Sequence, residues 1–190
     1  MSQLPISQIP VVAEDDASGD VAEIYDDIRR VMEIPFVPNI HKALSSSATA
    51  HQGTWDALRN VFLSTSLPMP VATMILYSIA AAKQCKYCSA VHQVTCKSLG
   101  VEEDTLAALD GNLQALAPQR VQAIVMFAQK CALDPQALDQ ADYDSVRAQG
   151  INDQEIVEII ALAALGNYLD TLADAMKIEI DSVFVEVLEG

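Results

Sequence analysis

The sequence predicts an all-α protein, built as one compact helical domain within a chain of 190 residues. Composition supports this prediction, because 51% of the residues are hydrophobic but only 5% are aromatic, which favours closely packed helices of small side chains. Apolar residues also recur at the spacing of one helix face, as Val21, Ile24, Ile28 and Val31 do. Residues that end helices punctuate the chain as well, among them Gly100.

Three regions divide the chain. Residues 1–19, which contain Pro5 and Pro10, are expected to form an extended arm. Residues 20–177 are expected to form the single helical domain. Residues 178–190 form a tail in which apolar and polar residues alternate for a few positions, so it is either an extended arm across a neighbour or a short helix.

Capping patterns place the helix ends. Asp20 is expected to cap the first helix with Glu23 as its reciprocal partner, and Asn152 with Glu155 repeats this capping box. The glycine and asparagine at 166–167 are expected to interrupt the last helix. The other predicted helices cover residues 39–48, 49–63, 71–83, 85–99, 102–109, 118–131 and 139–149.

Charge and hydropathy exclude some classes of partner. The formal net charge is −15 and the sequence pI is about 4.3, so nucleic acid and anionic membranes, which require a basic patch, are not expected as partners. The mean hydropathy of +0.21 is high for a soluble monomer. We therefore expect buried contacts between subunits, and hence a homo-oligomer.

One uncharged stretch is long enough to span a membrane, from Asn60 to Ala82. Pro68 and Pro70 lie inside it and indicate the start of a helix, so we interpret residues 71–82 as a buried core helix. The sequence starts without a basic region followed by an apolar run, so no secretory signal is expected. Four cysteines in such a chain indicate a reducing compartment, and we expect a cytoplasmic protein.

The densest chemical motif is Cys85-x-x-Cys88-x-x-x-His92-x-x-x-Cys96. At about 100° per residue in a helix, Cys85, His92 and Cys96 fall within about 40° of one another and Cys88 lies about 60° to one side. Cys85 and Cys88 are spaced for a disulfide, and His92 follows Cys88 by one helical turn. The motif is therefore a dithiol with a base beside it.

Not every cysteine and histidine is expected to take part. Cys96 is too far along the helix to bridge Cys85 and is interpreted as core, with a redox role as the lesser alternative. Cys131 is interpreted as a small buried hydrophobic residue. His41 and His51 are interpreted as surface or satisfied core residues rather than ligands.

These residues resemble a known family. The run from Met74 to His92, M-I-L-Y-S-I-A-A-A-K-Q-C-K-Y-C-S-A-V-H, followed by G-V-E-E from Gly100, resembles the carboxymuconolactone decarboxylase superfamily. Within it, the similarity is to the alkylhydroperoxidase-like, peroxidase-related branch. Further similar segments lie in the same order along the chain, at 37–39, 127–128, 151–160 and 167–175, so the resemblance covers roughly residues 20 to 180.

The resemblance implies an alkylhydroperoxidase D-like all-α fold with C-x-x-C at the start of a central helix, and a homo-oligomer, often a trimer or hexamer. It implies an antioxidant oxidoreductase, a peroxidase or disulfide reductase. On the family's pattern, Cys88 is the thiolate that attacks a hydroperoxide, Cys85 resolves the sulfenic acid into a disulfide, and His92 belongs to the proton relay. A dithiol, thioredoxin-like or lipoyl reductant then restores the thiols, and no cofactor or metal ion is implied.

The chain departs from the family at one position of the relay. Where the family usually has a glutamate, twelve residues before the first motif cysteine, this sequence has Thr73. The relay is then expected to be rebuilt from another residue, and the candidates are Tyr77, His51 or a carboxylate on a later helix, such as Glu155 or Glu158. If it is rebuilt, the pKa of Cys88 is expected below about 7.5, against about 8.5 for a free thiol.

Other functions stay open. Without a rebuilt relay, the protein would be a dithiol–disulfide oxidoreductase with little peroxidase activity. It would bind a metal ion if Cys85, Cys88 and His92 were joined by a fourth ligand such as His51. A decarboxylase or isomerase of a lactone-like acid is a third possibility, although members with that activity generally lack the C-x-x-C pair. A purely structural oligomer is the remaining alternative.

Overall fold

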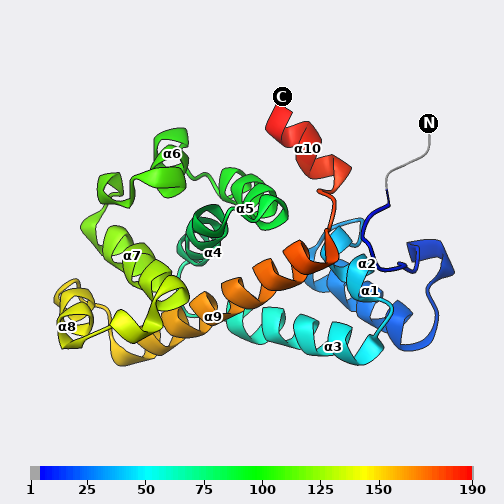
Figure 1. Ribbon diagram of the computed structural model, residues 1–190, viewed down its shortest axis with the longest axis horizontal. Coiled ribbons are helices and arrows are strands. Elements are labelled where there is room, and N and C mark those ends of the chain that lie inside the picture. Colours follow the sequence, from blue (N-terminus) through cyan, green and yellow to red (C-terminus); the bar gives the residue numbers. More distant parts are fainter. Residues whose placement is uncertain (1–4, 190) are drawn as a thin grey trace.

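The computed structural model describes residues 5–189, and their regular structure is helical throughout (Figure 1). This confirms the predicted all-α fold. The α-helices are α1 (Gly19–Met32), α2 (Asn39–Leu44), α3 (Ala48–Ala57), α4 (Met69–Lys83), α5 (Lys86–Ser98), α6 (Glu103–Gly111), α7 (Gln119–Leu133), α8 (Gln140–Ala148), α9 (Asp153–Met176) and α10 (Ser182–Glu189). A π-helical turn, Leu58–Leu63, continues α3.

The core lies where α9 crosses α4 and α7. Figure 1 shows α9 running along much of the molecule, and it packs against α4, α5, α7 and the π-helical turn. Every residue of α4 from Val71 to Ala80 is buried. The helix begins after Pro68 with Pro70 in its first turn, as the sequence predicts, because proline fits a position where no backbone N–H is needed.

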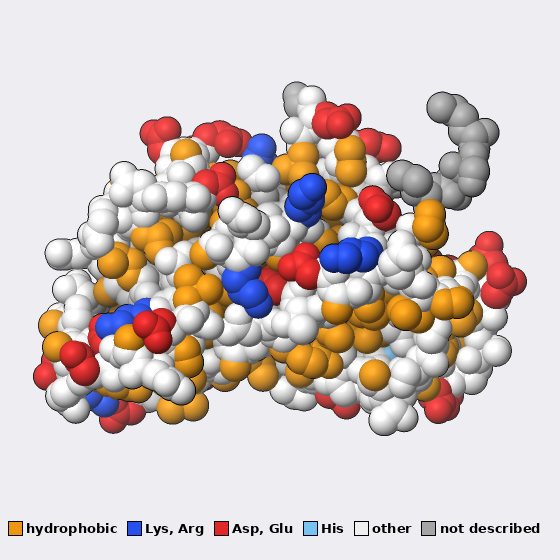
Figure 2. All heavy atoms as spheres, viewed as in Figure 1, with side chains coloured by type: hydrophobic (Ala, Val, Ile, Leu, Met, Phe, Trp, Pro, Cys, Tyr) orange, Lys and Arg blue, Asp and Glu red, His pale blue; other side chains and the backbone are white. Residues whose placement is uncertain are grey.

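By length and composition, α9 is apolar enough to cross a membrane, with a mean hydropathy of 1.5 over its most apolar 18-residue window. Half of that window is buried, and the buried half packs on α4 and α7. A core helix of a helical domain has these properties. Figure 2 shows acidic side chains spread around the edges of the molecule, with hydrophobic side chains between them.

The predicted break at 166–167 is wrong, because α9 is continuous through it. A Cβ atom added to Gly166 would lie 3.4 Å from side-chain atoms of Ile79 and Leu76, so the glycine lets α9 approach α4 closely. Asn167 remains helical and uses its side chain between helices, donating to the Ala132 carbonyl at 2.7 Å. The two residues mark a helix crossing rather than a helix end.

The predicted cap at Asp20 is also wrong. Helix α1 begins at Gly19, after Ser18 as the N-cap, and Asp20 lies within its first turn. The capping box of Asn152 and Glu155 is confirmed, with both of its hydrogen bonds present.

The arm and tail lie side by side. Residues 5–18 have little regular structure apart from a short 3₁₀ turn, Glu14–Asp16, and residues 1–4 of the predicted arm lie outside the described part. The Gln8 N–H donates to the Met176 carbonyl and the Glu179 N–H donates to the Ile6 carbonyl, both at 2.9 Å. The tail forms α10, which packs on α5, so its helical interpretation is confirmed.

Candidate active site

The two cysteines of the dithiol lie at the start of α5. Gln84 has a left-handed backbone (φ 59°) that ends α4 and turns the chain into α5. Cys85 is the N-cap residue and Cys88 lies in the first turn. Both thiols are free and buried, with 0% and 3% of each residue exposed. The sequence correctly predicts this placement at a helix start.

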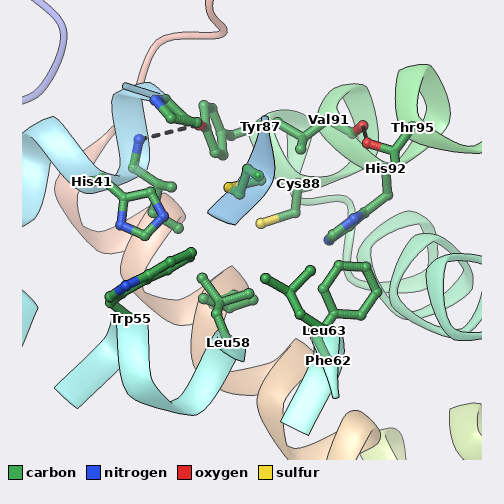
Figure 3. Close-up of a pocket in the computed structure, with 14 residues that line it drawn as sticks. His41, Trp55, Leu58, Phe62, Leu63, Tyr87, Cys88, Val91, His92 and Thr95 are labelled. Carbon is green, nitrogen blue, oxygen red and sulfur yellow. Dashed lines mark hydrogen bonds between the residues drawn. The ribbon is translucent and has the colours of Figure 1, made fainter. Parts of the chain in front are cut away.

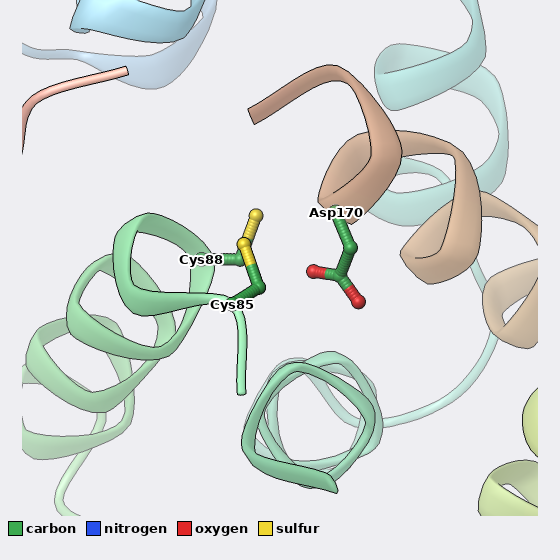
Figure 4. Close-up of side chains that lie close together, drawn as sticks. All are labelled: Cys85, Cys88 and Asp170. Atoms are coloured by element: carbon green, nitrogen blue, oxygen red, sulfur yellow. The ribbon is translucent and has the colours of Figure 1, made fainter. Parts of the chain in front are cut away.

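A carboxylate from a later helix completes this cluster, as one of the predicted alternatives allowed, but it is Asp170 rather than Glu155 or Glu158. The Cys85 and Cys88 sulfur atoms and a carboxylate oxygen of Asp170, on α9, all lie within 4.8 Å of one another (Figure 4). Asp170 is 2% exposed. One signal for it was available, because Asp170 follows Gly166 by one turn and therefore lies on the face of α9 that meets α4.

Asp170 is held in a polar corner next to the end of α4. Its Oδ2 lies 3.6 Å from the Lys83 ammonium and makes no hydrogen bond within residues 5–189. Lys83 is itself fixed by Asn167, whose Oδ1 accepts a hydrogen bond from Nζ at 2.9 Å. Burial raises the pKa of the Asp170 carboxyl, and the Cys88 thiol and the Lys83 charge offset part of this rise. Asp170 is thus a stronger base than an exposed aspartate.

None of the residues named above as relay candidates replaces the missing glutamate. Tyr77 donates to Asp110 at 2.6 Å, and His51 pairs with His41. Glu155 forms an ion pair with Arg120, and Glu158 accepts from Thr65 and Ser66. Thr73 is buried and donates to the Met69 carbonyl at 2.9 Å, as expected for a packing residue. The carboxylate beside the dithiol lies further along α9, the helix that also carries Glu155 and Glu158.

The expectation of a lowered pKa for Cys88 is also corrected. The pKa of the Cys88 thiol is raised, because the neighbouring Cys85 sulfur, the burial of the thiol and the Asp170 carboxylate all oppose a charge on its sulfur. A helix start alone favours a thiolate, but here the added carboxylate and the burial act against it. The thiol must therefore give up its proton to a nearby base when it reacts.

A hydrophobic cavity of about 110 Å³ opens beside Cys88 (Figure 3). Helix α5 contributes Cys88 and His92 to its wall, and α3 with the following π-helical turn contributes Trp55 and Phe62. Met32 at the end of α1 also lines it and is 38% exposed, so solvent reaches the cavity on that side. The cavity can hold a small apolar molecule against the thiol.

His92 shares this cavity with Cys88, as the helical spacing predicts. Burial lowers the pKa of the His92 imidazole to about 4, so the ring is neutral at pH 7. A neutral imidazole has a free nitrogen that can accept a proton. Figure 3 shows the ring directed toward the cavity, on the side of Cys88 away from His41.

The interpretation of His41 and His51 as surface or satisfied core residues is only half right. Both are buried, 1% and 0% exposed, but His41 lines the cavity and His51 Nδ1 has no hydrogen-bond partner in the described part of the chain. The His41 ring stands edge-on to Trp55, with ring centroids 5.6 Å apart. The spacing of His41 and His51 along the chain did not predict that the two rings would lie together.

Cys96 and Cys131 are core residues, as predicted, with 0% and 9% of each residue exposed. Burial raises the pKa of the Cys96 thiol to about 12, so it stays protonated. The alternative metal ligand set of Cys85, Cys88, His92 and His51 is not assembled. Among residues 5–189, the group close enough to share an ion is Cys85, Cys88 and Asp170.

Comparisons with known proteins agree with the fold. No protein-family profile matches the sequence. No curated protein matches it either. Among solved structures, an uncharacterized peroxidase-related protein with an alkylhydroperoxidase core, from Ralstonia eutropha JMP134, superposes with a TM-score of 0.86 at 21% identity, over 95% of each chain.

Two further structures are similar. A peroxidase-related protein from Silicibacter sp. TM1040 gives a TM-score of 0.79 at 17% identity, covering 95% of this chain and 92% of its own. A cysteine-to-alanine variant of the debrominase Bmp8, in complex with 2,3,4-tribromopyrrole, gives 0.79 at 16% identity over 95% of each chain. The chain therefore has the all-α fold of the alkylhydroperoxidase-like, peroxidase-related proteins, as the resemblance of its Cys85–His92 segment predicts.

Proposed function

We propose that this protein is a thiol-based oxidoreductase that reduces small organic hydroperoxides through Cys88 and Cys85. The observation that supports this most strongly is the group of two sulfur atoms and the Asp170 carboxylate within 4.8 Å, next to a hydrophobic cavity. The dithiol supplies two electrons, the carboxylate accepts a proton, and the cavity holds the organic part of the substrate.

The first step oxidises Cys88. Asp170 takes the proton of the Cys88 thiol, because its carboxylate oxygen lies within 4.8 Å of that sulfur and burial makes it a stronger base than an exposed aspartate. The thiolate attacks the terminal oxygen of R–O–O–H, so an S–O bond forms and the O–O bond breaks. The leaving alkoxide takes up the proton that Asp170 received. Cys88 becomes a sulfenic acid and the hydroperoxide becomes an alcohol.

His92 has a supporting role in this step. Its neutral ring lines the same cavity as Cys88 and offers a second acceptor for the thiol proton. It can also pass a proton between the dithiol and the cavity. His92 lines the cavity whereas Asp170 does not, so the proposed bases are one residue in the cavity wall and one outside it.

The second step closes a disulfide. The Cys85 sulfur attacks the sulfur of the Cys88 sulfenic acid, so an S–S bond forms, the S–O bond breaks, and the departing hydroxide leaves as water with the proton from Cys85. A dithiol reductant then restores both thiols by exchange through a mixed disulfide. The reductant would be a small dithiol, a lipoyl group or a thioredoxin-like protein. Reductants of this kind are present in a reducing compartment such as the cytoplasm.

Reductive debromination is a second candidate. The observation that favours it is the apolar cavity with Trp55 and Phe62 in its wall. Bmp8, whose fold is similar, is a debrominase. The dithiol would remove bromine from an aryl bromide as bromide ion, a proton would replace it on the ring, and Cys85 and Cys88 would become a disulfide. Like the reduction of a hydroperoxide, this reaction takes two electrons from the dithiol.

The test is a stopped-flow count of thiols lost per chain after mixing reduced protein with tert-butyl hydroperoxide. Wild type should lose two thiols rapidly, Cys85→Ser one, and Cys88→Ser none on that timescale. Cys131→Ser is the matched control and should behave as wild type. Slow loss in wild type, with rapid disulfide formation from an oxidised dithiol, would instead identify a disulfide reductase. Bromide release from a bromopyrrole without peroxide turnover would identify a debrominase.

A further inference from the structure

Two buried histidines form a pair, and one of them, His41, lines the cavity. His41 Nδ1 and His51 Nε2 lie 3.2 Å apart, and their ring centroids are separated by 5.3 Å. Burial lowers the pKa of His41 to about 3 and the pKa of His51 to about 4, so both rings are neutral at pH 7. One of the two facing nitrogens must therefore carry a proton and donate it to the other in a hydrogen bond.

The surroundings of His51 decide which ring carries it. If His41 Nδ1 were the donor, the proton of His51 would have to lie on Nδ1, which is buried without a hydrogen-bond partner in residues 5–189. A buried N–H without an acceptor is rare and costly. If His51 Nε2 is the donor, His51 Nδ1 carries only a lone pair. His51 therefore donates to His41, and the proton of His41 lies on Nε2.

This proton belongs to a ring that lines the cavity, since His41 is part of the cavity wall whereas His51 is not. Of the two ring nitrogens of His41, Nδ1 is paired with His51, so Nε2 is the one left to meet a bound molecule. Figure 3 shows His41 and His92 on opposite sides of the Cys88 thiol. The two hydroxyls of the wall already have partners, because Tyr87 donates to Asp181 Oδ2 at 3.0 Å and Thr95 donates to the Val91 carbonyl at 2.8 Å.

We propose that His41 Nε2–H is the hydrogen-bond donor that holds the polar end of the substrate, and that the cavity selects a compact apolar molecule with one acceptor oxygen. This inference rests on the proposed function and names its substrate class, a small branched alkyl hydroperoxide. The cavity volume of about 110 Å³ is below the roughly 150 Å³ of an engineered cavity that binds benzene. A tert-butyl group suits this size better than a substituted phenyl group does.

The donor acts on the oxygen where charge develops. When the O–O bond breaks, negative charge grows on the alkoxide oxygen, and a fixed N–H in a water-poor cavity stabilises it. His41 keeps its own proton throughout, since His51 holds its ring in place and the alkoxide is protonated by the base that took the thiol proton. His41 thus binds the substrate oxygen and stabilises the developing alkoxide, while Asp170 and His92 move protons.

The tautomers can be measured directly. The chain has three histidines, so long-range ¹H–¹⁵N spectra of histidine-labelled protein resolve each ring. We expect Nε2–H on both His41 and His51 at pH 7. Titration with tert-butanol, the product of the test peroxide, should shift the His41 Nε2–H proton and change the fluorescence of Trp55, the single tryptophan of the chain. Nδ1–H on His51, or a titration that moves neither signal, overturns the proposal.

Kinetics test the donor separately. His41→Phe keeps a ring but removes the donor and should slow oxidation by tert-butyl hydroperoxide about 100-fold, as expected for the loss of one such donor. His41→Gln keeps an N–H and should retain most of the rate. Alkylation of Cys88 by iodoacetamide, which needs no such donor, should change less than about twofold in either variant. Cumene hydroperoxide should react more slowly than tert-butyl hydroperoxide with wild type.

These results separate the two proposals. Equal tert-butyl hydroperoxide rates for wild type and His41→Phe would overturn the role of His41 while leaving the peroxidase function intact. If wild type reacts with no hydroperoxide, the proposed function fails, and the tautomers with the tert-butanol titration still decide whether His41 is a donor in a binding cavity. Circular dichroism checks that His41→Phe is folded, and the measurements on wild type do not depend on it.

Discussion

A carboxylate oxygen of Asp170, on α9, lies within 4.8 Å of the Cys88 sulfur, at the start of α5. This relationship joins α9 to the C-x-x-C motif of Cys85 and Cys88. The carboxylate is buried and has a positive charge beside it from Lys83. It is close enough to both sulfur atoms to be the proton acceptor that we propose, whereas the Thr73 hydroxyl already donates to the Met69 carbonyl.

Replacing Asp170 by asparagine should remove the proton acceptor while keeping the shape of the side chain. We expect the rate of Cys88 oxidation by tert-butyl hydroperoxide at pH 7 to fall about 100-fold, within the range found for general bases. Stopped-flow thiol loss measures this. Asp153→Asn, at an exposed aspartate at the start of the same helix, is the control and should react as wild type. A rate for Asp170→Asn equal to wild type would exclude Asp170 as the base.

The pH dependence of the reaction should follow the ionisation of Asp170. Because the pKa of Asp170 is raised, the rate should increase with pH through a midpoint above the usual aspartate range of about 4. Lys83→Met removes the charge that lowers this pKa, so the midpoint should move to higher pH. Lys97→Met removes a surface lysine that pairs with Glu103 and serves as the control. A midpoint that does not move would mean that Lys83 acts on another group.

Acid should destabilise the protein through its buried histidines. The pKa values of His41, His51 and His92 are lowered from 6.5 to about 3, about 4 and about 4. Between pH 6.5 and these values the unfolded chain binds protons that the folded chain does not, so the free energy of unfolding falls as the pH falls. Each histidine contributes a slope of at most about 1.4 kcal/mol per pH unit.

Urea unfolding at pH 7, 6 and 5 measures this slope. His92→Gln should remove about a third of it, since it removes one of three groups. The raised pKa values of Asp170 and Asp181 work in the opposite direction as these groups take up protons. A slope that is the same in wild type and His92→Gln would contradict the buried, neutral state of His92, because Asp170 and Asp181 are present in both proteins.

Gly166 should tolerate no branched side chain. A Cβ there already meets Ile79 and Leu76 at 3.4 Å, so Gly166→Val should overpack the contact between α9 and α4 and destabilise by about 1–3 kcal/mol in urea unfolding. A Cβ added to Gly53, in α3, would meet no atom within 4 Å, so Gly53→Ala should be neutral or should stabilise by up to about 1 kcal/mol. Equal effects at the two glycines would contradict the close helix crossing.

We propose that the exposed apolar side of α9 takes part in the homo-oligomer that the sequence predicts. Val157 and Tyr168 are 65% and 43% exposed, and Ala161 and Ala164 lie between them on the same helix face. Light scattering should give a mass that is a multiple of 20.5 kDa, and Val157→Asp should lower it. Leu133→Asp, at an exposed leucine of α7, should leave the mass unchanged. A wild-type mass of one chain would refute the interface.

The sequence by itself determined what depends on neighbouring residues. Helical periodicity and caps predicted the all-α fold, the buried helix α4 and the helix start that carries Cys85 and Cys88. These features follow from local geometry, because side chains three and four residues apart share one face of a helix. The same local rule placed His92 beside Cys88 at the cavity.

The tertiary structure alone decided which distant residues complete the site. Asp170 reaches the dithiol because α9 crosses α4 closely at Gly166, and that glycine taken as a local signal predicted a break instead. His41 and His51 meet because α2 and α3 fold against each other. The crossing point and rotation of two packed helices depend on how all their side chains interlock, and no short stretch of sequence contains that information.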